Sequence, residues 1–244
     1  MIPGYTKEAF IKLAAGENPP AYTRTRPKGV KLRHMPSINQ MYDAYEFAET
    51  GSSLKPGETQ YWRRTSHAPE EGSSAFGPVQ ITKSLVYDAM KYHPSFKARY
   101  GKWYGSHMEP MQKNFLKFGK EPHLKGYDIN YEYGGHGYWD PKHNDMYKQM
   151  GLDLMRLTMK DAEKRLMHIP RHNRTADDRI NAHIGVWRGA SKSKDKHYYD
   201  KVLDNLYSRY PALFDDFDES TVPPAVMSQR NARLAKMNDT WIYR

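Results

Sequence analysis

Segments whose apolar residues recur every three to four positions, the spacing of one face of an α-helix, occupy much of the sequence. Segments with this spacing run over residues 39–49, 82–92, 108–118, 145–167, 175–185 and 198–207. A stretch rich in Gly, Ser, Thr and Pro at 51–77 and one rich in Gly and Tyr at 126–138 favour loops or a small hairpin. The pattern predicts a mainly α protein with a small loop or hairpin subdomain.

Both ends of the chain have a different character. The N-terminal stretch has one short helical pattern at 6–15, and then basic residues interrupted by proline at 24–29, which favour an extended linker. The C-terminal stretch has acidic residues at 215–219, two prolines at 223–224 and a short basic helical pattern at 230–236. We therefore expect an N-terminal arm at 1–36, one central domain at 37–210 and a C-terminal arm at 211–244, with the arms binding partners.

Composition excludes several classes of protein. The 244 residues include no cysteine, which rules out disulfide frameworks, thiolate zinc sites and cysteine nucleophiles. Lys and Arg exceed Asp and Glu by 38 to 28, a net charge of +10, which predicts attraction to nucleic acid, acidic lipid or bacterial cell wall. Neither a membrane-spanning apolar run nor the start of a signal peptide is present, so we expect a protein that is soluble as made.

The carboxyl group of Glu49 lies at a position that favours general acid catalysis. Glu49 ends an apolar helical segment, and Thr50 and Gly51 follow it. The negative end of the helix dipole disfavours a carboxylate there, and neighbouring aromatic rings desolvate it, so we expect the pKa of Glu49 to be raised. A carboxyl with a raised pKa is suited to protonating a leaving group near neutral pH.

Five short motifs follow one another between residues 37 and 210. They are Ala-Glu-Thr-Gly at 48–51, Ala-Phe-Gly-Pro-Val-Gln-Ile at 75–81, Trp-Asp-Pro at 139–141 with Asn144, Asn-Ala-His-Ile-Gly at 181–185, and His-Tyr-Tyr-Asp-Lys-Val-Leu at 197–203. In this order they resemble motifs of the soluble lytic transglycosylases, a family of peptidoglycan-cleaving enzymes. The resemblance implies a lysozyme-like (α+β) helical domain without a cofactor.

The resemblance also implies roles for individual residues. Glu49 matches the family's single catalytic acid and base, and Gln80 matches a glutamine that lines the sugar groove. The resemblance implies cleavage between N-acetylmuramic acid and N-acetylglucosamine, with an anhydro ring formed on the muramic sugar. His183 stands where the family has a tyrosine that contacts the catalytic carboxyl. The further candidate substrate-binding residues are Phe76, Val79 and Tyr198, together with Tyr61 and Trp62 in the 51–77 loop, whose rings suit stacking on sugars.

Two alternatives to a transglycosylase remain open. A lysozyme-type hydrolase needs a second carboxylate, for which Glu58, Glu70 and Glu71 are candidates, whereas Glu46 is expected to be a surface or structural residue. A structural or nucleic-acid-binding virion protein is favoured by the net charge and by the basic arm at 24–33. We expect nucleic acid to be at most a secondary partner.

Histidine pairs raise the possibility of a metal site. His168 and His172 are four residues apart, but Pro170 interrupts any helix between them, and His136 and His143 lack a marked third ligand. We therefore expect no catalytic metal. Long polar arms and the lack of a signal peptide favour a phage virion component that cuts peptidoglycan strands during genome ejection and binds other virion proteins through its arms.

Overall fold

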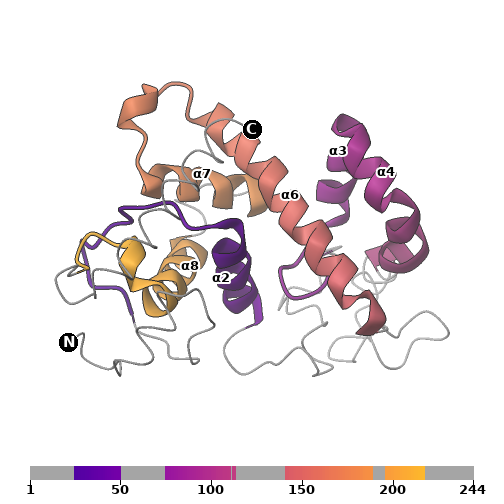
Figure 1. The fold of residues 1–244 in the computed structure, drawn as a ribbon, viewed down its shortest axis with the longest axis horizontal. Helices are drawn as coiled ribbons and strands as arrows, with labels where there is room; N and C mark the ends of the chain where they lie inside the picture. Colours follow the sequence, from indigo (N-terminus) through magenta and orange to yellow (C-terminus); the bar gives the residue numbers. More distant parts are fainter. Residues whose placement is uncertain (1–24, 51–74, 111, 114–140, 189–195, 218–244) are drawn as a thin grey trace, which may run out of the picture. The chain divides into compact units, whose positions relative to one another are not determined.

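The computed structural model describes residues 25–50, 75–110, 112–113, 141–188 and 196–217. These residues are mainly helical, with β structure confined among them to two isolated bridges (Figure 1). The predicted mainly α class is confirmed. The α-helices are α2 (Ile38–Thr50), α3 (Lys83–Tyr92), α4 (Pro94–Trp103), α6 (Asn144–Arg165), α7 (Ala176–Arg188) and α8 (Lys196–Arg209). Shorter elements are the π-helical turn η3 (Tyr104–Met108) and the 3-10 turns η5 (Pro141–His143), η6 (Arg171–Asn173) and η7 (Pro211–Leu213).

Apolar periodicity located most of these helices. Five of the six predicted segments coincide with α2, α3, α6, α7 and α8 to within three residues at either end. Helix α4 was missed, because it buries only Phe96 and Tyr100, one turn apart, and most of its other positions are polar or small. Of the predicted helix at 108–118, only residues to 113 are described, and the patterns at 6–15 and 230–236 lie outside the described residues.

Local side-chain hydrogen bonds fix where two helices begin. At the start of α2, the backbone N–H of Ser37 donates to Gln40 Oε1 (2.8 Å), and the backbone N–H of Gln40 donates to Ser37 Oγ (3.2 Å). At the start of α7, Thr175 and Asp178 make the same reciprocal pair, at 2.9 and 3.1 Å. Both are capping boxes, which pair backbone donors that a helix leaves without a partner in its first turn.

Residue contacts divide the chain into two compact units. The first unit comprises Met1–Ala44 with Met159–Arg244, and the second comprises Tyr45–Thr158. The boundaries fall inside α2 and α6, so each of these helices contributes to both units. Glu49 belongs to the second unit, together with the 75–82 segment.

In the first unit, the described ends of the two predicted arms are packed against each other. Leu32 and Phe214 form an antiparallel bridge, and both side chains are buried. The backbone N–H of Arg33 donates to Leu213 O (2.7 Å). The parts of the two expected arms at 30–36 and 211–217 are therefore folded structure, because each contributes buried apolar side chains.

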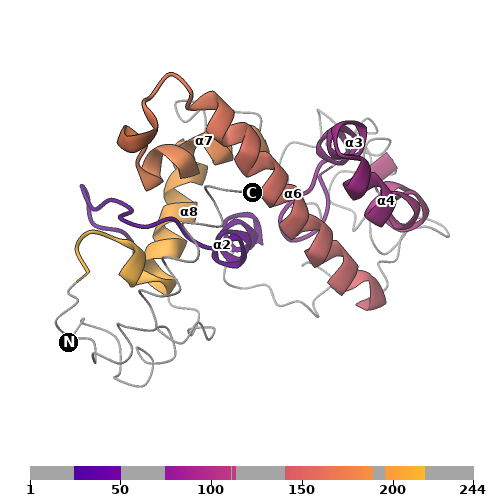
Figure 2. The ribbon, with the colours of Figure 1, turned by 45° about the horizontal axis from the view of Figure 1, so that its top comes forward.

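In the second unit, α3 packs on α4, and the two helices lie next to each other in both ribbon views (Figures 1 and 2). Asp153 of α6 accepts hydrogen bonds from Tyr100 Oη (2.5 Å) and Arg99 Nη1 (3.0 Å) of α4. Gln112 is wholly buried; it accepts from Tyr104 Oη (2.6 Å) and donates to Ile81 O (2.7 Å). These bonds join the π-helical turn to the segment that carries Gln80.

Candidate active site

Glu49 lies in the last turn of α2, as the sequence predicted. Its side chain is partly exposed, whereas Ala48 and Tyr45 on the same helix are buried. Burial raises the pKa of the Tyr45 phenol well above its usual value, and the negative charge of Glu49 raises it further. Tyr45 and Glu49 are four residues apart on α2, so their side chains lie on the same face of the helix.

Residues 76–81 form a tight, buried turn. Phe76 and Ile81 exchange backbone hydrogen bonds in both directions (3.1 and 3.0 Å), and the Gln80 N–H donates to Gly77 O (2.9 Å). The Gln80 side-chain amide donates to the same carbonyl (2.8 Å). Gln80 has a φ of +52°, which is strained for a residue with a side chain and is held here by these bonds.

Tyr147 of α6 holds this turn in place. Its hydroxyl donates to Phe76 O (2.6 Å), and its ring packs edge-on to the Phe76 ring with centroids 6.0 Å apart. The Tyr147 ring also occupies the position that a side chain on residue 77 would take, and Gly77 has a φ of +74°. Glycine is therefore required at position 77 both by backbone conformation and by the close approach of Tyr147.

The same tyrosine links the turn to Glu49. Tyr147 is wholly buried, and this burial is the main cause of its strongly raised pKa. Backbone hydrogen bonds from Val79 and Ile81 lower that pKa, whereas the negative charges of Glu46 and Glu49 raise it. Within the second unit, the charge of Glu49 thus acts on the tyrosine that holds the 76–81 turn. Sequence reasoning missed Tyr147, because its partner Phe76 is 71 residues away and no local pattern marks the pair.

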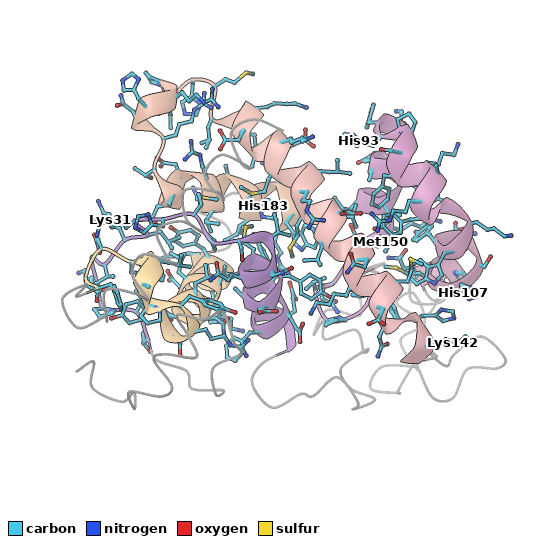
Figure 3. All side chains as sticks on the ribbon, viewed as in Figure 1. Lys31, His93, His107, Lys142, Met150 and His183 are labelled. Carbon is cyan, nitrogen blue, oxygen red and sulfur yellow. The ribbon has the colours of Figure 1, made fainter. Side chains whose placement is uncertain are left out.

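The other predicted site residues have different surroundings. Phe76 and Val79 have no exposed surface, so in this structure they pack inside the turn. His183 is buried in α7 of the first unit (Figure 3), where its ring stacks on that of Trp187 at 6.0 Å. Tyr198 of α8 is also buried in the first unit, with the Arg188 guanidinium 4.4 Å from its ring centroid. A contact of His183 or Tyr198 with Glu49 stays a prediction.

Several candidates lie outside the described residues. These are Tyr61 and Trp62, and the possible second carboxylates Glu58, Glu70 and Glu71. Glu46, expected to be a surface or structural residue, is partly exposed on α2, and its charge acts on Tyr147 together with that of Glu49.

The described histidines make other contacts. The ring of His143 packs against that of His107 at 4.0 Å, near the labelled Lys142 (Figure 3), and His143 Nδ1 accepts from Trp103 Nε1 (3.2 Å). His168 Nδ1 lies 3.0 Å from Arg165 O. Within the described ranges, no three His, Asp or Glu side chains gather as a metal site would require. His136 lies outside these ranges.

Buried tyrosines give the fold a predictable response to alkali. Burial is the main cause of raised pKa values at Tyr45, Tyr100, Tyr104, Tyr147, Tyr199 and Tyr210. A phenol whose pKa is raised in the folded state stabilises the fold fully below its unfolded pKa of about 10, and this stability is lost as the pH rises further. We expect tyrosinate absorbance at 295 nm from these residues to appear only together with loss of helical circular dichroism. A complete tyrosinate signal from a still helical protein would contradict this.

Comparison of the chain with protein-family models, with curated proteins and with solved structures gives no match. Of the helices in the described ranges, none is of the length and apolarity required to cross a bilayer. Function is therefore inferred from the residues of the site.

Proposed function

We propose that the chain is a peptidoglycan lytic transglycosylase with a lysozyme-like fold, in which Glu49 is the catalytic acid and base. The observation that carries the proposal is that one compact unit contains both a helix-ending glutamate and a strained, glutamine-bearing turn, and that the charge of the glutamate acts on the buried Tyr147 that holds the turn. The glutamate and the turn are the first two motifs of the resemblance. Backbone strain of the kind found at Gln80 is concentrated at functional sites in proteins.

One carboxyl is sufficient for the proposed reaction. Glu49 donates its proton to the oxygen of the bond between N-acetylmuramic acid and N-acetylglucosamine, and the bond from C1 to that oxygen breaks. The Glu49 carboxylate then takes the proton of the C6 hydroxyl of the muramic sugar, whose oxygen bonds to C1. The product is a 1,6-anhydro ring, and no water is consumed. Hydrolysis requires in addition a water and, in the usual case, a second carboxylate.

Tyr147 acts as a positioning residue in this proposal. Its hydroxyl and ring fix the 76–81 turn, while Glu49 lies close enough for its charge to act on the same phenol. A rigid neighbourhood of Glu49 favours the proposed reaction, because small errors in the position of the acid reduce rates strongly. Gln80 reaches the strand only if its side chain leaves Gly77 O, which it contacts in this structure.

Lysozyme-type hydrolysis is the second candidate, and one observation favours it. The charge of Glu46 acts on Tyr147 as that of Glu49 does, so two carboxylates of α2 influence the same buried phenol. In either case we propose a phage particle as the setting, in which the enzyme opens the wall for genome delivery and the terminal segments bind other virion proteins. The net charge of +10 supports approach to an anionic wall.

Mass spectrometry of the fragments released from purified peptidoglycan sacculi tests the proposal directly. A transglycosylase releases muropeptides with anhydro ends, each lacking one water relative to a reducing end. Reducing ends in place of anhydro ends would assign hydrolysis instead. Intact sacculi after prolonged incubation with folded protein would contradict both enzymatic candidates and favour a structural or nucleic-acid-binding role.

A further inference from the structure

The connection from α6 to α7 is a basic part of the described chain, and we call residues 160–174 the α6–α7 turn. In Figure 1 it is the orange segment at the upper left, and Figure 3 shows nitrogen-bearing side chains around it. It contains five Lys or Arg and two Asp or Glu, which gives 5 − 2 = +3, and two histidines add to this charge when protonated. The cations are Lys160, Lys164, Arg165, Arg171 and Arg174.

Both acidic residues of the turn are held by cations within the first unit. Asp161 pairs with Lys164 Nζ at 2.7 Å. Glu163 pairs with Arg174 at 3.0 Å and with Arg179 of α7 at 2.6 Å. The negative charge is thereby neutralised inside the turn, while Lys160, Arg165 and Arg171 are exposed.

The turn is an ordered structure with a fixed apex. Arg174 Nε donates to Ile169 O (2.9 Å), and the backbone N–H groups of Met167 and Ile169 donate to Lys164 O (3.2 Å) and Leu166 O (2.9 Å). The buried Leu166 anchors the turn to the core. The cations are therefore presented on a rigid support, which lowers the entropic cost of binding a partner.

An apolar side chain stands among these cations. Met167 is 72% exposed, more than any other large hydrophobic residue of the described chain. Ile169 is partly exposed and Pro170 is exposed beside it. A segment in which an exposed apolar residue is flanked along the chain by exposed cations matches the boundary of an anionic bilayer, where apolar groups enter the interface and Lys or Arg approach the headgroup phosphates. Surfaces that bind single-stranded nucleic acid instead combine cations with aromatic rings for stacking, and the turn contains no Phe, Tyr or Trp.

We propose that the α6–α7 turn docks on the surface of an anionic phospholipid membrane. Met167 enters the interface, and Lys160, Arg165 and Arg171 contact lipid phosphates. The docking is peripheral and reversible, and it does not depend on Glu49 or on the proposed enzymatic function.

Co-sedimentation of the full chain with vesicles tests the docking. We expect binding to phosphatidylcholine vesicles that contain about one third phosphatidylglycerol, and much weaker binding to phosphatidylcholine alone. A variant carrying Lys160→Gln, Arg165→Gln and Arg171→Gln should bind the anionic vesicles about 100-fold more weakly, at about fivefold per cation. Met167→Ser should weaken binding about fivefold through loss of apolar contact.

Matched controls come from exposed residues of the second unit. Lys97→Gln, Lys102→Gln and Lys148→Gln together remove the same charge, and Tyr92→Ser removes an apolar side chain that is 65% exposed. Both controls should bind within about threefold of wild type. All substituted residues are exposed, and circular dichroism with thermal melting verifies that each variant is folded.

Three outcomes would overturn the proposal. The first is no preference of the wild type for anionic vesicles, and the second is an equal loss in the control and the turn variants. The third is a turn-dependent affinity for a labelled duplex DNA in the absence of vesicle binding, which would assign the turn to nucleic acid. Glu49→Gln should bind vesicles as wild type does, so failure of docking and failure of the enzymatic proposal are distinguishable.

Discussion

Glu49→Gln is expected to lower the rate of glycosidic bond cleavage by about two to four powers of ten, the usual contribution of a general acid and base. The amide cannot donate a proton to the leaving oxygen or accept one from the C6 hydroxyl. It has nearly the same shape as the carboxyl and is partly exposed, so the fold should be retained. The measurement is the rate of anhydro-muropeptide release by mass spectrometry, with circular dichroism as the test of folding.

Glu46→Gln is the matched control for this variant. Glu46 is one turn earlier on the same helix, is partly exposed in the same way, and acts on the same tyrosine. If Glu49 is the single acid of a transglycosylase, Glu46→Gln should retain the wild-type cleavage rate within a few-fold. A loss of similar size in both variants, with reducing ends on the remaining product, would contradict the single-carboxylate mechanism and favour hydrolysis. Unchanged activity of Glu49→Gln would refute the catalytic assignment.

Gly77→Ala is expected to lower the free energy of unfolding by about 2–5 kcal/mol. The added Cβ enters the space of the Tyr147 ring, and overpacking of a buried site costs about 1–3 kcal/mol. The positive φ at residue 77 adds about 1–2 kcal/mol for any residue with a side chain. Urea denaturation followed by circular dichroism measures the change.

Substitutions of two other glycines, Gly29 and Gly105, distinguish the effect of overpacking from the effect of the positive φ. Gly29 has a φ of +93°, and no atom lies within 4 Å of an added Cβ. Gly29→Ala should therefore lower the free energy of unfolding only by the amount due to the positive φ. An added Cβ on Gly105 also meets nothing within 4 Å, and its backbone is helical, so Gly105→Ala should be neutral or slightly stabilising. If Gly77→Ala costs no more than Gly29→Ala, then the Tyr147 ring yields to the methyl group and does not fix the turn.

The helices were predictable from sequence because amphipathic periodicity and capping residues are local signals. Helix α2 and the position of Glu49 at its end are examples, and the Ser37 and Gln40 capping box lies next to the helix that it starts. Helix α4 had too few apolar positions to be recognised, although Pro94 at its first position is a common start.

The site was predictable only in part. The resemblance marked Gly77 and Gln80, but the physical reason for a glycine at 77 is the ring of Tyr147, which lies 70 residues along the chain. Phe76 and Val79 were predicted to contact substrate, and in the structure they are wholly buried. Packing between residues far apart in the sequence decides both the need for glycine at position 77 and the burial of Phe76 and Val79. No local sequence pattern encodes such packing.

The π-helical turn at Tyr104–Met108 makes the 76–81 segment sensitive to chain length. A π-turn holds one residue more than an α-turn, so it is equivalent to a single-residue insertion in a regular helix. Removing one residue there would restore the α-helical repeat and rotate every later side chain by about 100°. Gln112 would then no longer face Ile81 O, to which it donates at 2.7 Å. The number of residues between Tyr104 and Gln112 therefore decides whether the 76–81 turn has this second attachment, in addition to the one through Tyr147 of α6.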